Sequence, residues 1–285
     1  MKTVSETSTT KNKKSNAYTL KCLGLFLIGW LGLKIASTLV QLFVMLFQNV
    51  PFDQAINYLV NGEVTKSVYL ALSPNWASML VNALAYAIVA LAMCLLLNKD
   101  LVEHIKSFKN GKAFAAGLVG FVLILTFNNV YRSLVNPLYP VSDNVNEESL
   151  DSIITIYPLC SILVFGILGP IVEELTYRAG LFTLAKKKNK LFAYIVTILI
   201  FGFIHFSFES IVSASQTGDT SWLINELLNM PTYMFAAAVF IYLFDNFGFA
   251  GSASAHLINN LISIVTQIIV SKLWKNLNFL SVNLY

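Results

Sequence analysis

Repeated, largely apolar runs of about 20 residues set the strictest limit on how this chain can fold. The clearest of them lie at 76–97 and 252–273. A run of that length can cross the roughly 30 Å hydrocarbon core of a bilayer as an α-helix. Because an unpaired backbone amide is costly in lipid, only helices and closed barrels can span a membrane. The runs are continuous rather than alternating, and they therefore predict helices.

The composition agrees with a membrane protein. Of the 285 residues, 56% are hydrophobic and 12% are charged, whereas ordinary soluble proteins carry about 25% charged residues. The sequence has no stripe of Lys and Arg with interleaved aromatic residues outside the spans, so a nucleic-acid partner is not expected. The apolar runs make the lipid bilayer an expected partner. The three cysteines lie in or beside apolar runs without a CxxC pair, which predicts buried free thiols: Cys22, Cys94 and Cys160.

We expect an all-α polytopic membrane helix bundle of about seven transmembrane helices, within a range of roughly six to eight. Residues 1–18 are polar and predict a disordered cytoplasmic tail, and residues 19–285 form one integral membrane domain. The predicted spans are 22–47, 76–97, 114–138, 153–185, 191–208, 222–244 and 252–273.

The segments between these spans are polar or mixed. The stretch 51–73 predicts either an interfacial helix or an external loop. Three further segments are predicted to be loops or turns: 141–151, 209–221 and 245–251. Glycine and proline interrupt two of the spans, and each interruption predicts a kink or a break: Gly166, Gly169 and Pro170 in the fourth, and Pro231 in the sixth.

The distribution of lysines predicts the orientation of the chain. The N-terminal tail and the lysine-rich loops at 99–112 and 186–190 are expected in the cytoplasm, and the acidic loop at 143–151 outside. Seven crossings would then place the C-terminus outside. The predicted depth of His256, close to the cytoplasmic end of its span, favours a cavity that opens toward the cytoplasm.

Three charges fall inside the fourth apolar run, in the sequence Glu173-Glu174-Leu175-Thr176-Tyr177-Arg178. Each costs roughly 2.5–3.5 kcal/mol at the centre of a membrane helix. Glu174 and Arg178 are four residues apart, so they share a helix face and can pair. Glu173 lies about 100° further round the helix. It can therefore face a water-filled cavity and act as a general base.

Other polar residues lie in later spans. His205 is late in the fifth span, and His256 and Asn260 are one turn apart on the seventh. With Glu173, Glu174 and Arg178 they make up an acid and base constellation with an oxyanion donor. The alternative for any polar residue in a span is a hydrogen bond between helices, worth roughly 0.6–2 kcal/mol. We assign that role to Asn128, Asn129, Arg132, Asn225 and Glu226, although Arg132 could also line a cavity.

The three segments EELTYR at 173–178, Phe201 to His205 and His256 to Asn260 resemble the motifs EExxxR, FxxxH and HxxxN of the CAAX prenyl protease and bacteriocin-processing (CPBP, Abi) family. That family consists of glutamate-dependent intramembrane endopeptidases. The resemblance implies a catalytic core at about 152–272, in which Glu173 activates a water with help from His205. It further implies that Glu174 and Arg178 organise the site by pairing, and that His256 and Asn260 stabilise the oxyanion.

The resemblance implies hydrolysis of a peptide bond in a peptide precursor, a leader or a membrane-associated protein tail, in a bacterial cell membrane and without a metal or other cofactor. Two histidines and a glutamate could alternatively make a three-ligand zinc site. Two other functions stay open. One is a bacteriocin immunity protein that binds without proteolysis, and the other is a transporter with a proton relay.

Overall fold

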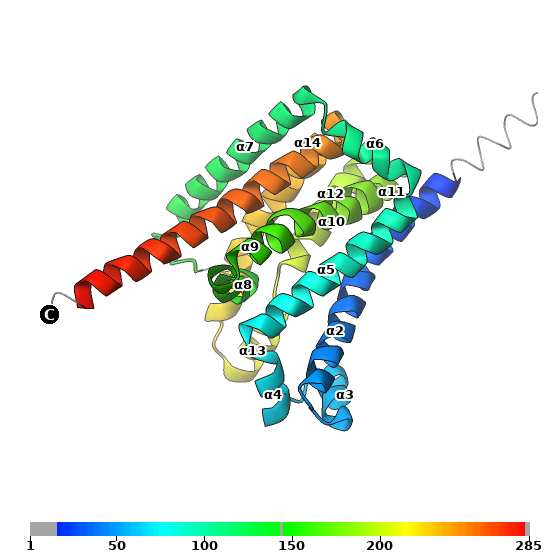
Figure 1. Cartoon of the computed structure of the whole chain (residues 1–285). Helices are drawn as coiled ribbons and strands as arrows, with labels where there is room; N and C mark the ends of the chain where they lie inside the picture. Colours follow the sequence, from blue (N-terminus) through cyan, green and yellow to red (C-terminus); the bar gives the residue numbers. More distant parts are fainter. Residues whose placement is uncertain (1–15, 143–144, 283–285) are drawn as a thin grey trace, which may run out of the picture.

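The computed structural model of the protein describes residues 16–142 and 145–282, and it contains helices but no strand in that part of the chain. The first helix begins at Asn16, so the last three residues of the predicted tail are helical, and residues 1–15 lie outside the described part. The predicted all-α architecture is confirmed (Figure 1).

Five described helices are long and apolar enough to cross a membrane. They are Asn16–Phe47, Asn75–Leu97 (α5), Gly111–Val135 (α7), Pro158–Lys186 and Ser221–Leu273. A sixth span is broken, because α12 (Lys190–Ile204) and α13 (Glu209–Thr217) meet at an angle of 59°. These spans lie close to the predicted ones.

The last of these helices supplies two crossings. Helix α14 (Ser221–Val282) has a non-helical residue at Gly248, with φ 75° and ψ −169°. Only glycine adopts this backbone conformation without strain. The 53 residues of Ser221–Leu273 would extend about 80 Å as a straight helix, more than twice the apolar thickness of a bilayer. Residues 221–247 and 249–282 are therefore separate spans, which gives the predicted seven crossings in the described residues.

Several predicted loops contain helices. The predicted turn at 245–251 is reduced to Gly248, with helix on either side. The acidic stretch contains α8 (Val145–Ile156), and the polar stretch after His205 contains α13. The mixed stretch at 51–73 forms two short helices, α3 (Phe52–Asn61) and α4 (Lys66–Leu72). Local caps explain part of this, since Thr65 accepts a hydrogen bond from the Val68 amide at the start of α4.

The fourth span is the centre of the bundle. Of its most apolar window 56% is buried, against 22–33% for the other four spans. It is helical without a break across the predicted glycines and proline, and it alternates between α and π geometry. Its segments are α9 (Pro158–Ser161), η2 (Ile162–Leu168), α10 (Gly169–Glu173), η3 (Glu174–Phe182) and α11 (Thr183–Lys186). Such π turns inside helices are frequent at functional sites.

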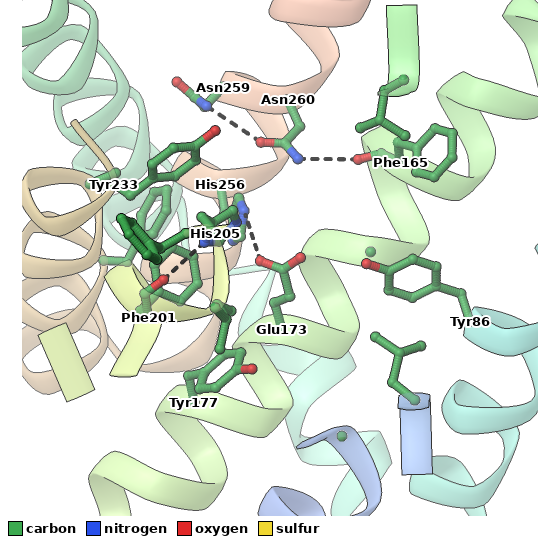
Figure 2. Close-up of a pocket in the computed structure, with 18 of the residues that line it drawn as sticks. Tyr86, Phe165, Glu173, Tyr177, Phe201, His205, Tyr233, His256, Asn259 and Asn260 are labelled. Atoms are coloured by element: carbon green, nitrogen blue, oxygen red, sulfur yellow. Dashed lines mark hydrogen bonds and ion pairs between the residues drawn. The ribbon is translucent and has the colours of Figure 1, made fainter. Parts of the chain in front are cut away.

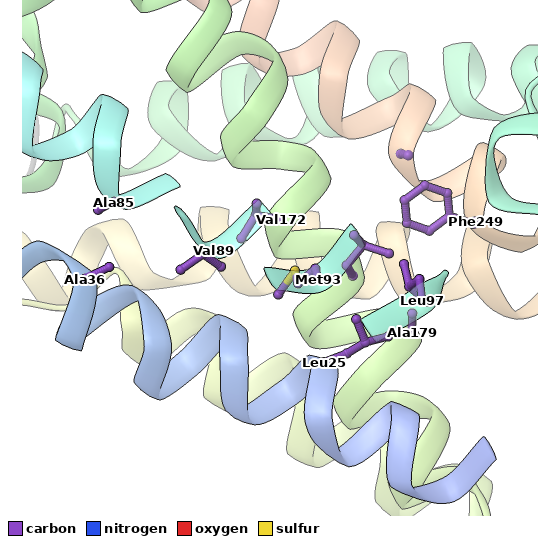
Figure 3. Packing of buried hydrophobic residues seen from close by; sticks show 11 residues of the cluster. Leu25, Ala36, Ala85, Val89, Met93, Leu97, Val172, Ala179 and Phe249 are labelled. Atoms are coloured by element: carbon purple, nitrogen blue, oxygen red, sulfur yellow. The ribbon is translucent and has the colours of Figure 1, made fainter. Parts of the chain in front are cut away.

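Small residues let neighbouring helices approach this central span. A Cβ atom on Gly29 would come within 1.7 Å of the Thr176 hydroxyl, and one on Gly180 within 2.8 Å of the Phe26 amide nitrogen. One buried cluster joins the first span, α5, the central span and α14, and includes Leu25 and Val172 (Figure 3). Because lipid tails are as apolar as these side chains, close van der Waals packing stabilises the bundle more than the hydrophobic effect does.

The two ends of the bundle differ in charge. The start of the first span, α6 (Lys99–Ser107) and α11 lie at one end, and α3, α4 and α13 lie at the other (Figure 1). At the first end Lys21 pairs with Asp100 at 2.5 Å, and Lys190 pairs with Asp245 at 2.7 Å. We call it the basic end.

The three cysteine thiols are free, but only Cys22 is buried, so the prediction of burial is wrong for Cys160, which is exposed.

Candidate active site

A cavity of about 840 Å³ lies between the helices and brings together four of the six predicted site residues. Glu173, His205, His256 and Asn260 line it (Figure 2). Glu174 and Arg178 do not line it, because both side chains are fully buried behind its wall. The site therefore has two layers, a cavity face and a buried layer.

The buried layer contains the predicted ion pair. Arg178 Nη1 lies 3.2 Å from Glu174 Oε1, and both side chains are 0% exposed. The guanidinium also lies over two aromatic rings, 4.4 Å from the centroid of Phe201 and 5.1 Å from that of Phe240. Contact with the electron-rich faces of these rings stabilises the buried cation.

Both carboxylate oxygens of Glu174 have partners on the last span. His256 Nδ1 lies 2.8 Å from Oε1, and the Ser252 hydroxyl donates a hydrogen bond to Oε2. Ser252 and His256 are one helical turn apart, so they face the same way. Sequence reasoning missed Ser252, although its position four residues before the motif histidine could have indicated it. A carboxylate held by an arginine, a histidine and a serine is fixed in direction.

His256 connects the buried layer to the cavity face. Its Nε2 atom lies 3.7 Å from Oε2 of Glu173, while its Nδ1 atom contacts Glu174. Its ring stacks on Phe240 with the centroids 4.5 Å apart. When the ring carries both protons, each N–H has a carboxylate partner. The side chain of Glu173 is 19% exposed, in contrast to the buried Glu174.

His205 stands at the break between α12 and α13. Helix α12 stops at Ile204, and His205 Nδ1 lies 2.9 Å from the carbonyl oxygen of Phe201. That contact indicates that Nδ1 carries the proton in the neutral ring, which leaves Nε2 as the basic atom. The ring stacks on Tyr233, with centroids 4.2 Å apart and planes 15° apart. His205 is thus held in one orientation on the cavity wall.

The amide of Asn260 is also oriented. Its Nδ2 atom donates to the Phe165 carbonyl oxygen at 3.1 Å, and its Oδ1 atom accepts from Asn259 at 3.4 Å. An amide nitrogen carries two hydrogens, and the bond to Phe165 uses one of them. The second N–H can serve a group in the cavity.

The polar residues assigned to helix packing lie elsewhere. Asn225 Oδ1 accepts from the Ser142 amide at 3.0 Å, and Glu226 Oε2 accepts from the Ser207 amide at 3.0 Å. These bonds tie α14 to the segments after α7 and α12. Among the described residues that line the cavity, none is from the remaining set of Asn128, Asn129 and Arg132.

Tyr86 and Lys34 also line the cavity, and neither was predicted from the sequence to belong to the site. Tyr86 comes from α5, and its hydroxyl points toward Glu173 (Figure 2). Lys34 comes from the middle of the first span. A lysine near the centre of an apolar run is itself a signal of function, and the sequence analysis did not use it.

The cavity extends away from the basic end. Its wall includes Asp151, Phe208 and Gln267, which lie on or beside α8, α13 and the outer half of the last span. The cytoplasmic opening stays a prediction, as does the orientation of the bundle on which it depends. Because helix α14 breaks at Gly248, the last span begins at residue 249 rather than 252, so His256 lies about one turn deeper in that span than predicted.

The described residues contain no group of three or more His, Cys, Asp or Glu side chains arranged to hold a metal ion. Glu173 and His256 approach each other, with Oε2 of Glu173 3.7 Å from Nε2 of His256. His205 uses its Nδ1 atom on a backbone carbonyl. The geometry supplies acids, bases and hydrogen-bond donors around a cavity.

Comparison with known proteins gives a family match and two relatives. Residues 155–262 match the family described as Type II CAAX prenyl endopeptidase Rce1-like. The "UPF0177 protein YvdC" of Lactococcus lactis subsp. lactis (strain IL1403) is 24% identical over 157 residues, which are 54% of this chain and 52% of that protein. The "Putative membrane peptidase YdiL" of Bacillus subtilis (strain 168) is 24% identical over 161 residues, which are 56% of this chain and 65% of that protein.

No solved structure matches the chain. The chain spans about half of the first relative's length and just under two thirds of the second's. The matched segment contains all three motifs, with Glu173 near its start, His205 near its middle and Asn260 near its end. The protein is an integral multi-pass membrane protein, and its residues 155–262 are similar to the Type II CAAX prenyl endopeptidase Rce1-like family.

Proposed function

We propose that this chain is an intramembrane endopeptidase in which Glu173 and His205 activate a water molecule for attack on a peptide bond. One observation carries the proposal. Four groups suited to this chemistry line a single cavity at the depth of the central span: Glu173, His205, His256 and Asn260. A general base must be able to reach the proton that it removes, and the partly exposed carboxylate of Glu173 can reach a water in that cavity.

The reaction needs no other reactant. The water oxygen bonds to the carbonyl carbon while Glu173 takes one water proton, and the carbonyl oxygen becomes an oxyanion. His256 Nε2 and the second amide hydrogen of Asn260 are positioned to stabilise that charge, an effect worth on the order of 10²–10³ in rate for each donor. The C–N bond then breaks, and the proton moves from Glu173, with His205 beside it, to the leaving amine.

The proposed role of the buried layer is to hold His256. With Nδ1 directed at Glu174, the ring can present an N–H to the oxyanion only when it carries both protons. In that form each ring N–H faces a carboxylate, with Nδ1 2.8 Å from Glu174 and Nε2 3.7 Å from Glu173. We infer that Glu174, Arg178 and Ser252 do not touch the substrate.

The proposed substrates are peptide precursors, leaders or membrane-associated protein tails, and the proposed location is a bacterial cell membrane. The cavity lies within the span region, so the cleaved bond must enter the bilayer or its edge. Both relatives come from bacteria, and one of them carries the name of a membrane peptidase. These similarities support the proposal.

Replacing Glu173 by Gln tests the proposed function. The change keeps the size of the side chain and removes its basicity, so cleavage should fall by about 10²–10⁴. Peptides secreted by cells and peptides held in their membranes would be compared by mass spectrometry, with wild-type and Glu173→Gln protein at matched expression. Glu209→Gln, on the exposed start of α13, is the matched control. Unchanged processing in Glu173→Gln would refute the proposal, and toxin protection without processing would support the immunity function.

A chelator tests the proposed independence from metal. Because the proposed chemistry uses only protein groups and water, purified wild-type protein should retain its activity in the presence of EDTA or phenanthroline. Activity that is lost in chelator and restored by zinc would establish the three-ligand alternative instead. Bound metal measured on the purified protein would be a second readout, independent of activity.

A further inference from the structure

We propose that Lys34 forms a subsite for a carboxylate of the substrate peptide, next to the bond that is cleaved. The inference rests on the proposed function, because it requires a peptide in the cavity. It defines the substrate class more narrowly. The peptide should carry a negative charge, from its C-terminus or from an Asp or Glu side chain, within a few residues of the cleaved bond.

Contacts between the first and central spans place Lys34 at the depth of Glu173. The two spans run in opposite directions: Lys187 hydrogen-bonds Thr19, a Cβ on Gly180 would meet Phe26, and a Cβ on Gly29 would meet Thr176. As residue numbers rise in the first span, they fall by a similar amount in the central one. Continuing this register with about 1.5 Å of rise per residue puts Lys34 level with about residues 171–172, adjacent to Glu173.

Lys34 also faces the same space as Glu173. It lines the cavity together with Trp30, and its Nζ atom lies 5.7 Å from the centroid of the Trp30 ring. Trp30 belongs to the π segment η1 (Ile28–Gly32) of the first span. The ring face attracts the ammonium group and restrains it beside the cavity.

Lys34 has no ion-pair partner within residues 16–142 and 145–282. The acidic groups of the cavity are engaged elsewhere, since Glu173 contacts His256 and Asp151 accepts a hydrogen bond from Gln267. A charged group at mid-membrane is costly, and such groups normally pair or line a functional pathway. A cation in the cavity without a protein anion is best explained by an anion that arrives with the substrate.

The depth of Lys34 selects a peptide carboxylate over a lipid headgroup. The residue lies about 20 Å along the helix from Phe47 and about 27 Å from Asn16, the two ends of its span. A lysine side chain cannot reach a headgroup phosphate from that depth without leaving the cavity. A carboxylate on an extended peptide that binds beside Glu173 can reach the ammonium directly.

Binding to the inactive protein tests this subsite without depending on hydrolysis. Full-length Glu173→Gln protein in lipid nanodiscs would be titrated with a fluorescent, apolar Ala, Leu and Val peptide in four forms. The C-terminus would be free or amidated, and one internal position would be Glu or Gln. With Lys34 present, a form that carries the recognised carboxylate should bind about ten- to one-hundredfold more tightly than its uncharged match.

Three variants in the Glu173→Gln background test whether Lys34 causes the preference for the charged peptide. Lys34→Gln should abolish the preference, Lys34→Arg should keep most of it, and Lys112→Gln, at the exposed start of α7, should leave it unchanged. A preference for the free over the amidated C-terminus would show that Lys34 binds a C-terminal carboxylate. A preference for the Glu over the Gln peptide would show that it binds a side-chain carboxylate. Equal binding of charged and uncharged forms would overturn the proposal, and so would a Lys34→Gln change that weakens all four forms alike.

The result is separable from the proposed function. If wild-type protein cleaves none of the peptides but the Lys34-dependent preference persists, hydrolysis fails and the subsite stands. If cleavage depends on Glu173 but carboxylates bind no better than amides, the subsite fails and hydrolysis stands.

Discussion

Glu173 and Glu174 are neighbours in the sequence but lie in opposite environments. The side chain of Glu174 is 0% exposed and contacts Arg178, His256 and Ser252. That of Glu173 is 19% exposed, lines the cavity and has one such contact, to His256 at 3.7 Å. One step of about 100° round the central span separates a carboxylate that is fixed from one that can exchange protons with water.

The difference shows how a bundle in lipid can hold a reactive group. Orienting a side chain takes a rigid set of partners, and a charged partner in lipid needs an opposite charge beside it because unpaired charges there are costly. The protein places that set behind the cavity wall, around Glu174. His256 then carries the orientation to the cavity face, since one ring contacts both carboxylates.

The comparison predicts a large loss of stability for changes in the buried layer and a small one for changes on the cavity face, and Arg178→Met should give the largest change in stability. Removing the guanidinium leaves Glu174 buried and without its cation, which costs about 3–5 kcal/mol in a buried pair. Thermal unfolding of the protein in detergent would measure the loss. Glu173→Gln, on the cavity face, should change stability by less than about 0.5 kcal/mol although it removes activity.

A double variant separates charge burial from general damage. In Arg178→Met with Glu174→Leu no charge is left unpaired, and replacing both partners of a buried pair by apolar groups is often nearly neutral. Much of the stability should return while activity stays low, because His256 has lost its orienting carboxylate. A double variant as unstable as Arg178→Met alone would show that the unpaired carboxylate of Glu174 does not cause the loss of stability.

Much of this arrangement could be predicted from the sequence because lipid makes polar residues conspicuous. The seven spans follow from apolar length, and the pairing of Glu174 with Arg178 follows from their spacing of four. The gathering of Glu173, His205, His256 and Asn260 around one cavity was expected from the resemblance to a known family, and the structure shows it. Their chemical roles stay a proposal.

Other features could not be read from the sequence, for physical reasons. Helices α8 and α13 are short segments whose formation depends on packing rather than on a strong apolar period. The one-residue break at Gly248 has no signature that sets it apart from the other glycines of that stretch. Lys34 and Ser252 do stand out in the sequence, but the groups that they face depend on how two distant spans rotate against the central one, and the sequence pattern does not encode that rotation.

Ser252→Ala is the smallest change that tests the buried layer. The variant removes the hydrogen bond to Glu174 Oε2 and leaves the arginine and histidine contacts in place. A bond to a charged group is worth about 1.5–3 kcal/mol, so the protein should unfold at a lower temperature. If the bond also steadies His256, kcat should fall by about tenfold while KM changes little, since each factor of ten corresponds to about 1.4 kcal/mol of barrier.

Ser254→Ala is the matched control, because Ser254 is buried on the same helix but faces Gly117 of α7 rather than Glu174. It should leave kcat and its pH profile unchanged. A purely structural role for Ser252 would lower the unfolding temperature without altering the pH profile of kcat. A shifted profile in Ser252→Ala alone would show that the buried layer acts on the cavity through His256, because that ring is the described contact that joins Glu174 to Glu173.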